Sequence, residues 1–487
     1  MRTTKEGRPM HVVVLGGGPV GLTAAMLLAR EGHRVTLLDK DPDGPGVDAE
    51  HAWDQWRRSG VNQFRHPHLV LPGAYHLLSQ ELPEAITELR ALGARSHNML
   101  DGAYDLPTIG GRKPGDERFD TLAARRPVLE QGLGNAAVHA GVTVRRETPV
   151  TGFLTEATPA SGVLHITGVL TAQGEEIHAD LVVDALGRNS PASKMLTDVG
   201  APAPKYDKHE TGFLAYSRYF RSADGSYPDQ AAWPLEHHSS LGITTVPGDA
   251  GTWAVALFVS AKDRAMRALS DPEVWQRVAA LYPGMAHWAS YGEPITGVLA
   301  MSGMESRHRR FVIDNKPVAT GLLSIGDAWA TTNPTFGYGI TMGMAHALLL
   351  RDVLRETGFD DREKLALRFD EITDDTLGRT QQASAAWDLH RLEQIDLEIA
   401  AIPYVEGVVY RTDDPEWHLR QALEAAKLQD PDVLRAYSDV GSGLSSPEEA
   451  LARPGVLDRA MDIGGGATGY PQPGPSRVEL LTAIGAR

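Results

Sequence analysis

The sequence predicts an α/β fold built on a parallel sheet that holds a ligand between two glycine-containing turns. Three observations support this prediction. A buried-strand pattern at 12–15 leads into a glycine-rich turn and a helix, a second buried-strand pattern at 322–325 leads into a Gly-Asp turn, and several short strand patterns lie between them. Short, continuous β-branched runs are typical of parallel strands that are covered on both faces.

Length and composition limit the class of protein. A chain of 487 residues predicts two or three domains, and 42% hydrophobic with 23% charged residues is typical of a globular protein. A net charge of −16 argues against a nucleic-acid partner, because such a surface repels phosphates. The absence of cysteine excludes disulfides, thiolate metal sites and cysteine nucleophiles.

Membrane insertion and export are not expected. No uninterrupted apolar run reaches the ~18 residues that a membrane-spanning helix needs. The first 33 residues contain apolar pieces, but glycines and charges interrupt them and no small-residue cleavage site follows. We therefore expect a cytoplasmic protein.

The first glycine turn has the pattern of a diphosphate site. Val12 to Leu15 is followed by Gly16-x-Gly18-x-x-Gly21, with Pro19 and Val20 inside the motif, and a helical stretch begins at Leu22. In such a motif the glycines serve a tight turn, close approach of the backbone to a pyrophosphate, and close helix–strand packing. The helix N-terminus supplies oriented amides and partial positive charge. The alternative is that this segment is an ordinary glycine-rich turn of an α/β protein that binds no dinucleotide.

A second strand, 35–38, ends at an acid. Asp39 lies 18 residues beyond Gly21, close to where dinucleotide-binding folds have the carboxylate that accepts hydrogen bonds from a ribose. Lys40 follows directly and is included in the candidate site. These features predict dinucleotide binding but do not distinguish FAD from NAD.

The stretch 142–183 favours FAD. A Rossmann dehydrogenase would continue here with alternating strands and helices, whereas this stretch has the pattern of short strands and turns, with Gly174 in one turn. We interpret it as a β-meander inserted into the parallel sheet. FAD-binding folds of the glutathione-reductase type have such an insertion.

The second turn has the features of a flavin site. Gly326 and Asp327 follow the buried strand, at the sheet edge where ligands of open parallel sheets bind. Asp327 would accept hydrogen bonds from ribityl hydroxyls. Gly337 and Gly339 would let backbone amides approach a flat ring ahead of a helix from about 340 to 354. The alternative is an ordinary strand, turn and helix with an Asp cap.

Together these motifs resemble the FAD-dependent monooxygenase superfamily, which includes aromatic hydroxylases, squalene and polyene epoxidases and flavin halogenases. Beside the first glycine motif with Asp39 and the later "GDAW…NPTFGYG", the segments 60–74, 125–133, 179–196 and 473–481 are similar to a bacterial branch near the polyether epoxidases. The resemblance covers about residues 10–380 and, more loosely, the tail. It implies bound FAD, molecular oxygen and a small organic substrate.

The resemblance also implies particular residues. Arg126 matches the family position that contributes a side chain to FAD, although Arg125 is an alternative and both could be solvated helix charges. Val150 matches the position whose backbone contacts adenine. Beside the second turn, candidate substrate residues are Trp329, Asn333, Pro334 and Phe336.

The expected organisation has four parts. An FAD-binding domain covers 1–200 and resumes at 318–360, a mixed-sheet substrate domain covers 201–317, and a helical region with a tail covers 361–487. Met301 or Met304 would face an apolar substrate. His66 and His68 alternate as metal ligands might, but no third ligand accompanies them, so we expect hydrogen-bonding roles and no metal.

The expected function is hydroxylation or epoxidation of a small, largely apolar substrate through a flavin hydroperoxide, in secondary metabolism. No catalytic base is nominated. Many such hydroxylases carry an Asp-Gly pair, associated with FAD and NADPH binding, where this chain has Leu186-Gly187. We therefore expect electrons from NAD(P)H to arrive through a separate flavin reductase, or directly from a nicotinamide that binds only transiently. Alternatives are a reductase of the geranylgeranyl-reductase kind, a flavin carrier, and a halogenase, whose Trp-x-Trp-x-x-Pro signature is absent.

Overall fold

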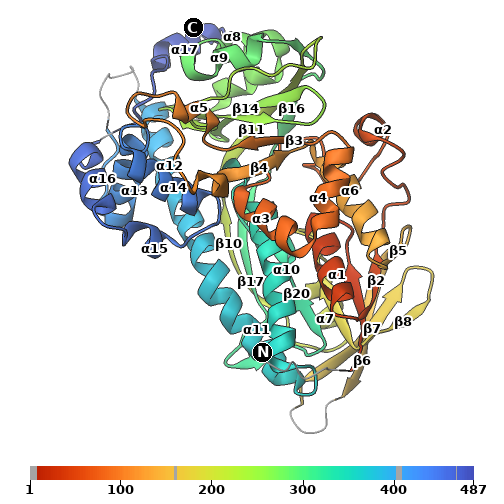
Figure 1. Cartoon of the computed structure of the whole chain (residues 1–487). Coiled ribbons are helices and arrows are strands. Elements are labelled where there is room, and N and C mark those ends of the chain that lie inside the picture. The colour runs from red at the N-terminus through yellow and green to blue at the C-terminus, as the bar shows by residue number, and fades with distance from the viewer. Residues whose placement is uncertain (1–7, 158–161, 402–408, 468, 487) are drawn as a thin grey trace.

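The computed structural model describes residues 8–157, 162–401, 409–467 and 469–486. A five-stranded sheet in the order β20-β9-β1-β2-β5 lies at the centre of the lower half in Figure 1, and each neighbouring pair is parallel. Its strands are β1 (His11–Leu15), β2 (Arg34–Leu38), β5 (Thr143–Arg145), β9 (Leu181–Asp184) and β20 (Leu322–Ser324). The predicted α/β fold with a parallel sheet is confirmed.

Different layers cover the two faces of this sheet. Val12 and Val14 pack against helices α1 (Pro19–Arg30), α6 (Arg126–His139) and α10 (Tyr338–Thr357). Val13 and Leu15 pack against the opposite layer, an antiparallel sheet of β6 (Val150–Ala157), β7 (Leu164–Thr171) and β8 (Glu176–His178). Because both faces are buried, the strand is continuously apolar from Val12 onward.

The inserted meander is shorter than the predicted 142–183. Its first expected strand is β5, which pairs in parallel with β2, and its last is β9, which pairs in parallel with β1 and β20. Only the segment from β6 to β8 forms the antiparallel layer. Every residue of β9 is buried, as expected for a strand inside the central sheet and not for one at the surface of a meander.

Shorter elements complete this half of the molecule. Two helices, α3 and α4, extend the helical layer, and β3 pairs with β4 beside it. The elements are α2 (Ala49–Asp54), α3 (Pro72–Glu81), α4 (Pro83–Ala91), β3 (Arg95–Asn98), α5 (Asp101–Tyr104), η1 (Asp116–Phe119), β4 (Asp120–Ala123) and α7 (Ala192–Asp198).

A second sheet forms the other half, at the top of Figure 1. Its strands are β12 (Leu235–His237), β13 (Leu241–Pro247), β14 (Thr252–Ser260), β11 (Phe213–Arg221), β15 (Glu293–Pro294) and β16 (Leu299–Met301). Along β14, Trp253, Val255 and Leu257 pack under η2 (Arg264–Ser270), α8 (Pro272–Ala279) and α9 (Pro283–Ser290). Ala256 and Phe258 therefore face the opposite way, toward the central sheet's half.

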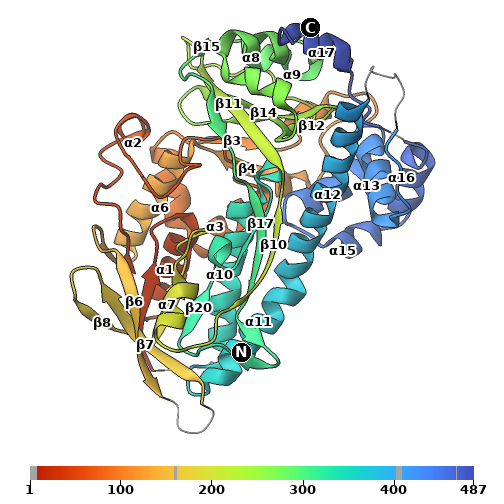
Figure 2. The same cartoon turned by 180° about the vertical axis from the view of Figure 1, so that it is seen from behind.

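A third sheet connects the two halves (Figure 2). It consists of β10 (Lys205–Glu210), β17 (Glu305–Arg310) and β21 (Ala330–Thr331), so the strands expected in 201–317 are divided between two sheets. The division follows from β17, which pairs with β21 just beyond the second glycine turn. The short pair β18 (Val312–Ile313) and β19 (Lys316–Pro317) leads into β20.

The C-terminal region is helical, as predicted. The long helix α12 runs beside both halves in Figure 2, and α17 returns to the second sheet, where Leu480 joins its core. The helices are α11 (Arg362–Thr373), the π-helical η5 (Asp374–Gly378), α12 (Arg379–Ala400), α13 (Pro415–Ala426), α14 (Pro431–Gly441), α15 (Pro447–Leu451), α16 (Val456–Gly464) and α17 (Arg477–Ala483). Within the described ranges, none of the helices combines the length and apolar character that a bilayer crossing requires.

Candidate functional site

The first glycine turn lies between β1 and α1, and its glycines are constrained in different ways. Gly16 has a φ of 101°, which favours glycine, and a Cβ on Gly21 would lie 2.0 Å from the Gly16 carbonyl oxygen. A Cβ on Gly18 would meet no atom of the described residues within 4 Å apart from its own chain neighbours. Gly18 therefore borders open space at the N-terminus of α1, where Pro19 is the first helical residue. This is the kind of space that a diphosphate requires.

Asp39, at the end of β2, is buried and shapes this turn. Its carboxylate accepts hydrogen bonds from the amides of Gly17 (2.7 Å) and Asp41 (2.9 Å) and forms an ion pair with Arg58. The neighbouring Lys40 is exposed, and its ammonium group lies beside Gly60. Asp39 is thus a fixed acceptor at the end of the strand.

Arg58 is a member of this site that the sequence analysis missed. Its buried guanidinium also pairs with Asp41 (2.8 Å) and Glu130, and donates to the Gly17 carbonyl (3.0 Å). Burial disfavours its charge, but Glu130 and Asp39 outweigh burial and raise the pKa of Arg58. Nothing local in the sequence distinguishes it from Arg57, because its partners come from three separate segments.

Val150, the expected adenine contact, is the first residue of β6. The Thr148 amide, two residues earlier, donates to the Asp39 carbonyl oxygen at 2.9 Å. The start of β6 therefore lies beside the end of β2.

The second turn follows β20 and is held from two sides. Gly326 has a φ of 58°, and its amide donates to His346 Nδ1 at 3.2 Å. The buried Arg309 donates to the backbone oxygens of Asp327 (3.2 Å) and Arg188 (2.6 Å). Neither His346 nor Arg309 was expected, although together they fix the turn that presents Asp327.

Asp327 is the acidic residue of this turn, and its carboxylate has no hydrogen-bond partner among the described residues. Its carboxylate makes no hydrogen bond or ion pair with any part of the chain that the structure describes, and a Cβ on Gly339 would lie 4.0 Å from its Oδ1. Burial raises the pKa of Asp327, while the charges of Arg126, Arg188 and Arg309 act in the opposite direction. A carboxylate that is close to cations but without a protein donor fits a ligand rich in hydroxyl groups.

Arg126 begins α6, and its charge acts on this acid. Its Nε donates to Glu130 (2.8 Å) and its NH1 to His68 Nε2 (2.9 Å), and its charge acts on Asp327. Burial and the Arg126 charge lower the pKa of His68 well below its ordinary value, so His68 is neutral. Arg126 is thus linked to the first turn through Glu130 and Arg58, and its charge acts on the second turn.

Arg125, the alternative candidate, points elsewhere. Its guanidinium is fully buried, pairs with Asp249 at 2.6 Å and Glu50 at 2.7 Å, and lies over the Trp53 ring. These contacts bind the start of α6 to the second sheet. The structure therefore gives the two neighbouring arginines different tasks.

Val20 joins the two turns directly. A Cβ on Gly326 would lie 3.0 Å from Val20 Cγ1, and a Cβ on Gly343 of α10 would lie 2.3 Å from Val20 Cγ2. The first turn, the second turn and the helix after it consequently form one contiguous surface.

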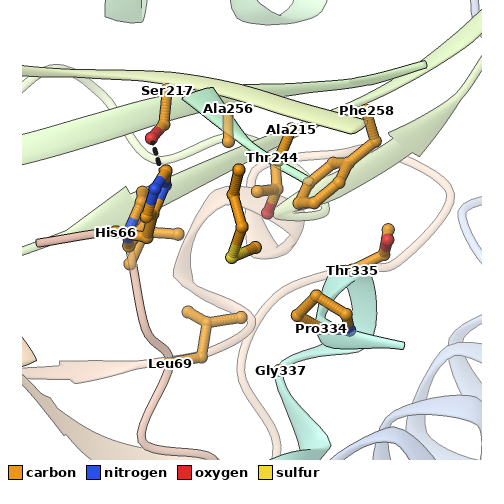
Figure 3. A pocket seen from close by; sticks show the side chains of 13 residues that line it. His66, Leu69, Ala215, Ser217, Thr244, Ala256, Phe258, Pro334, Thr335 and Gly337 are labelled. Atoms are coloured by element: carbon orange, nitrogen blue, oxygen red, sulfur yellow. Dashed lines mark hydrogen bonds between the residues drawn. The ribbon is translucent and has the colours of Figure 1, made fainter. Parts of the chain in front are cut away.

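A cavity opens beside the 334–337 segment, between it and the second sheet (Figure 3). About 420 Å³ of space not filled by protein atoms lies in this cavity and the open solvent at its mouth. Most of its lining side chains are apolar, and none is Arg, Lys, Asp or Glu. The lining residues are His66, Pro67, Leu69, Ala215, Ser217, Thr244, Val246, Ala256, Phe258, Met301, Pro334, Thr335 and Gly337.

Two of the expected substrate residues have clear positions relative to this cavity. Pro334 lines it, next to Gly337. Trp329 is buried away from it, with ring centroids 5.0 Å from His308 and 4.9 Å from His346. Trp329 therefore supports the second turn from behind.

The other two lie beside the cavity lining. Asn333 is buried, donates to Asp388 (2.7 Å) and accepts from the Thr335 amide (3.0 Å), so it caps the short helix η4 (Pro334–Phe336). Phe336 packs edge-on against Trp387, with centroids 4.8 Å apart. Both residues hold the segment, which presents Pro334, Thr335 and Gly337 to the cavity.

The two glycine turns have space and polar groups that fit the two ends of an FAD molecule. Gly18 leaves open space at a helix N-terminus, Asp327 has an unused carboxylate on which the Arg126 charge acts, and Gly337 borders a mainly apolar cavity. A parallel sheet with such turns at the carboxyl ends of its strands is typical of dinucleotide-binding folds.

Comparison with known proteins supports an FAD-binding fold. Two family models, both described as an FAD binding domain, match residues 11–211 and 120–361. Protein Rv3254 of Mycobacterium tuberculosis is 28% identical over 80% of this chain and 82% of its own, and 6-methylpretetramide 4-monooxygenase of Streptomyces rimosus is 24% identical over 73% and 77%. The chain belongs to the FAD-dependent monooxygenase superfamily and is an FAD-dependent oxidoreductase.

Solved structures show the same fold. The flavin-dependent brominase Bmp2 superposes with a TM-score of 0.60 at 16% identity, covering 93% of this chain and 98% of its own. PqsL of Pseudomonas aeruginosa gives 0.58 at 15% identity, covering 80% and 99%. The predicted superfamily and FAD cofactor are confirmed.

Proposed function

We propose that this monooxygenase hydroxylates or epoxidises an uncharged, largely apolar organic substrate in the cavity of Figure 3. The cavity is the main evidence for this proposal. It adjoins the second glycine turn, and its lining contains no carboxylate, amine or guanidinium group. A charged substrate group would be buried there without a counter-charge, which is costly. Relatives such as 6-methylpretetramide 4-monooxygenase support a reaction in secondary metabolism.

The cofactor residues follow from the two turns. Gly16, Gly18, Pro19, Val20 and Gly21 would hold the diphosphate at α1, with Asp39 and Lys40 near the ribose and Val150 near the adenine. Arg126, Gly326 and Asp327 would hold the ribityl chain, and Gly337 with Gly339 would approach the ring. FAD supplies the redox and oxygen chemistry when bound, and the protein supplies geometry and an apolar enclosure.

Reduction by NAD(P)H, direct or through a separate flavin reductase, completes the proposal. Asp184, the acid nearest to Leu186-Gly187, is fully buried and accepts from Leu186 N (3.0 Å), Ser190 (2.7 Å) and Ser324 (3.2 Å). The Asp184 carboxylate already accepts three hydrogen bonds within the fold and is not free to bind a nicotinamide cofactor, which favours the separate reductase. Rapid NADPH oxidation by the purified protein alone would contradict that preference.

Labelled oxygen tests the reaction. The FAD-loaded protein is supplied with NADPH, a general flavin reductase, candidate substrates and ¹⁸O₂, and products are analysed by mass spectrometry. A monooxygenase gives one ¹⁸O atom per product molecule. Substrate reduction without label would indicate the reductase alternative, a halogenated product formed with added bromide or chloride would indicate a halogenase, and no turnover would favour a carrier.

A further inference from the structure

A chain of hydrogen bonds leads from α6 to the cavity. Glu130 accepts from Arg126, Arg126 donates to His68 Nε2 (2.9 Å), and His68 Nδ1 lies 2.8 Å from the His66 carbonyl oxygen. Since an arginine only donates, His68 Nε2 must be the acceptor. In the neutral ring Nδ1 then carries the hydrogen and donates to the His66 carbonyl oxygen. The backbone of His66 is therefore fixed, through His68, by Arg126, whose charge acts on Asp327.

The second sheet fixes the ring of His66. Its Nδ1 lies 3.0 Å from Ser217 Oγ, and the dashed line in Figure 3 marks this hydrogen bond. Ser217 is 1% exposed, and its strand β11 pairs with Ala256 of β14 and Leu299 of β16. The position of Ser217 is thus determined on both sides, and it orients the imidazole.

His66 Nε2 remains available. Within the described residues it makes no hydrogen bond, and His66 lines the cavity together with Ser217. Burial lowers the pKa of His66 to about 4, so the ring is neutral at physiological pH. The cavity therefore offers a neutral polar atom in otherwise mainly apolar surroundings.

The chemistry of this atom selects the ligand group. Depending on which atom of the His66–Ser217 pair donates, Nε2 is either a donor or an acceptor. A hydroxyl group can satisfy both states, a carbonyl only one. A carboxylate would lack the cationic partner that pays for its burial.

We propose that His66 is the specificity-determining contact of this enzyme: its Nε2 hydrogen-bonds a hydroxyl group of an uncharged, otherwise apolar substrate, with Ser217 as the positioning residue. The proposal rests on the proposed function and names the substrate class for the same cavity. A site built around such a bond discriminates strongly against analogues without the hydroxyl.

Ligand binding to the oxidised, FAD-loaded protein tests this without turnover. The probes are 1-naphthol, 1-methylnaphthalene of similar shape, and 1-naphthoate, and each is titrated while the flavin absorbance spectrum is recorded. We expect wild type to bind 1-naphthol most tightly. His66→Leu should weaken 1-naphthol at least tenfold and leave 1-methylnaphthalene within about twofold, because only the former loses a hydrogen bond.

Three further variants complete the design. His66→Gln, which keeps a polar group, should restore part of the 1-naphthol affinity. Ser217→Ala should show a smaller selective loss, and it serves as the second test if His66→Leu fails to load FAD. Ser270→Ala, at an exposed position on η2 outside the cavity lining, should leave both affinities within about twofold.

Opposite results would overturn the proposal. These are equal losses for 1-naphthol and 1-methylnaphthalene, tightest binding of 1-naphthoate, or no spectral change with 1-naphthol in wild type. If the probes are discriminated as expected but no ¹⁸O is incorporated, the proposed function fails while the recognition by His66 stands.

Discussion

The side chain of Val20 packs against Gly343 so closely that a Cβ on Gly343 would lie 2.3 Å from Val20 Cγ2. Val20 belongs to the first glycine turn and Gly343 to α10, the helix after the second turn. The contact therefore determines how the two halves of the FAD site lie relative to each other.

Gly343→Ala should destabilise the protein and weaken FAD binding together. The added methyl group has to displace Val20, and such overpacking costs about 1–3 kcal/mol. Urea unfolding and FAD titration measure both effects. Val20→Ala in the same chain should recover part of the loss, whereas Gly134→Ala, in a helix where a Cβ meets nothing within 4 Å, should cost no stability. Unchanged FAD affinity in Gly343→Ala would contradict the coupling.

Gly18 and Gly21 should separate ligand binding from folding. Gly18→Ala adds a methyl group in open space at an ordinary φ of −82°, so we expect wild-type unfolding but at least tenfold weaker FAD binding. Gly21→Ala should impair both, since its Cβ would meet the Gly16 carbonyl. Fluorescence titration with FAD and thermal unfolding measure the two properties. Full FAD affinity in Gly18→Ala would mean that the diphosphate does not lie at this turn.

Arg125 and Arg126 should differ when each is replaced by glutamine. Arg125→Gln leaves the fully buried Asp249 without its cation, a change that costs about 3–5 kcal/mol, and the added Asp249→Asn should recover much of it. Arg126→Gln should cost less stability, because Glu130 keeps Arg58 as a partner, but it should weaken FAD binding. Unfolding curves and FAD titrations compare them. Equal effects would contradict the division of tasks.

The strands of the central sheet could be predicted because their signal is local. Val12 to Leu15 is apolar without interruption, Leu322 to Ile325 is apolar except for Ser324, and a glycine turn follows each. The extent of the meander could not be predicted in the same way. Short runs such as Leu181–Val183 have the same pattern in a parallel sheet and in a buried antiparallel one, so only the pairing with β1 distinguishes them.

Several site residues could not be predicted because their roles depend on distant partners. Arg309 holds the second turn from β17, and His346 reaches Gly326 from α10. Neither belongs to a motif. Trp329 lies close to Asp327 in sequence, but the backbone of η3 (Gly326–Ala328) turns its ring toward His308 and His346. No periodic pattern in so short a segment indicates which side chain faces the cavity.

Asp327→Asn should have opposite effects on stability and on FAD binding. Burial raises the pKa of Asp327, so its charge is unfavourable in the folded protein without ligand, and the neutral amide should stabilise that form slightly. The loss of a charged acceptor should weaken FAD binding about tenfold or more. Chemical unfolding of the FAD-free protein and FAD titration give the two values. A stability loss with unchanged FAD affinity would contradict this role. Asp352→Asn, at a partly exposed position on α10, serves as the control.

Asp388 should make stability depend on pH. It is buried on α12, accepts from Asn333, and its burial raises the pKa to about 7 from an ordinary value of 3.8. Between these two values the folded protein keeps a proton that the unfolded chain has lost, so this group's contribution to stability falls as pH rises from 4 to 7. By linkage the loss is at most about 4 kcal/mol.

Asp388→Asn should remove this dependence, because the amide oxygen still accepts from Asn333 and carries no titrating proton. Relative to wild type, the variant should therefore gain stability as pH rises from 4.5 to 8, and urea unfolding across that range measures the difference. Asp375→Asn, at an exposed position on η5, should keep a constant difference from wild type. A difference for Asp388→Asn that stays constant, or that shrinks with rising pH, would show that the carboxyl is ionised throughout in the folded protein.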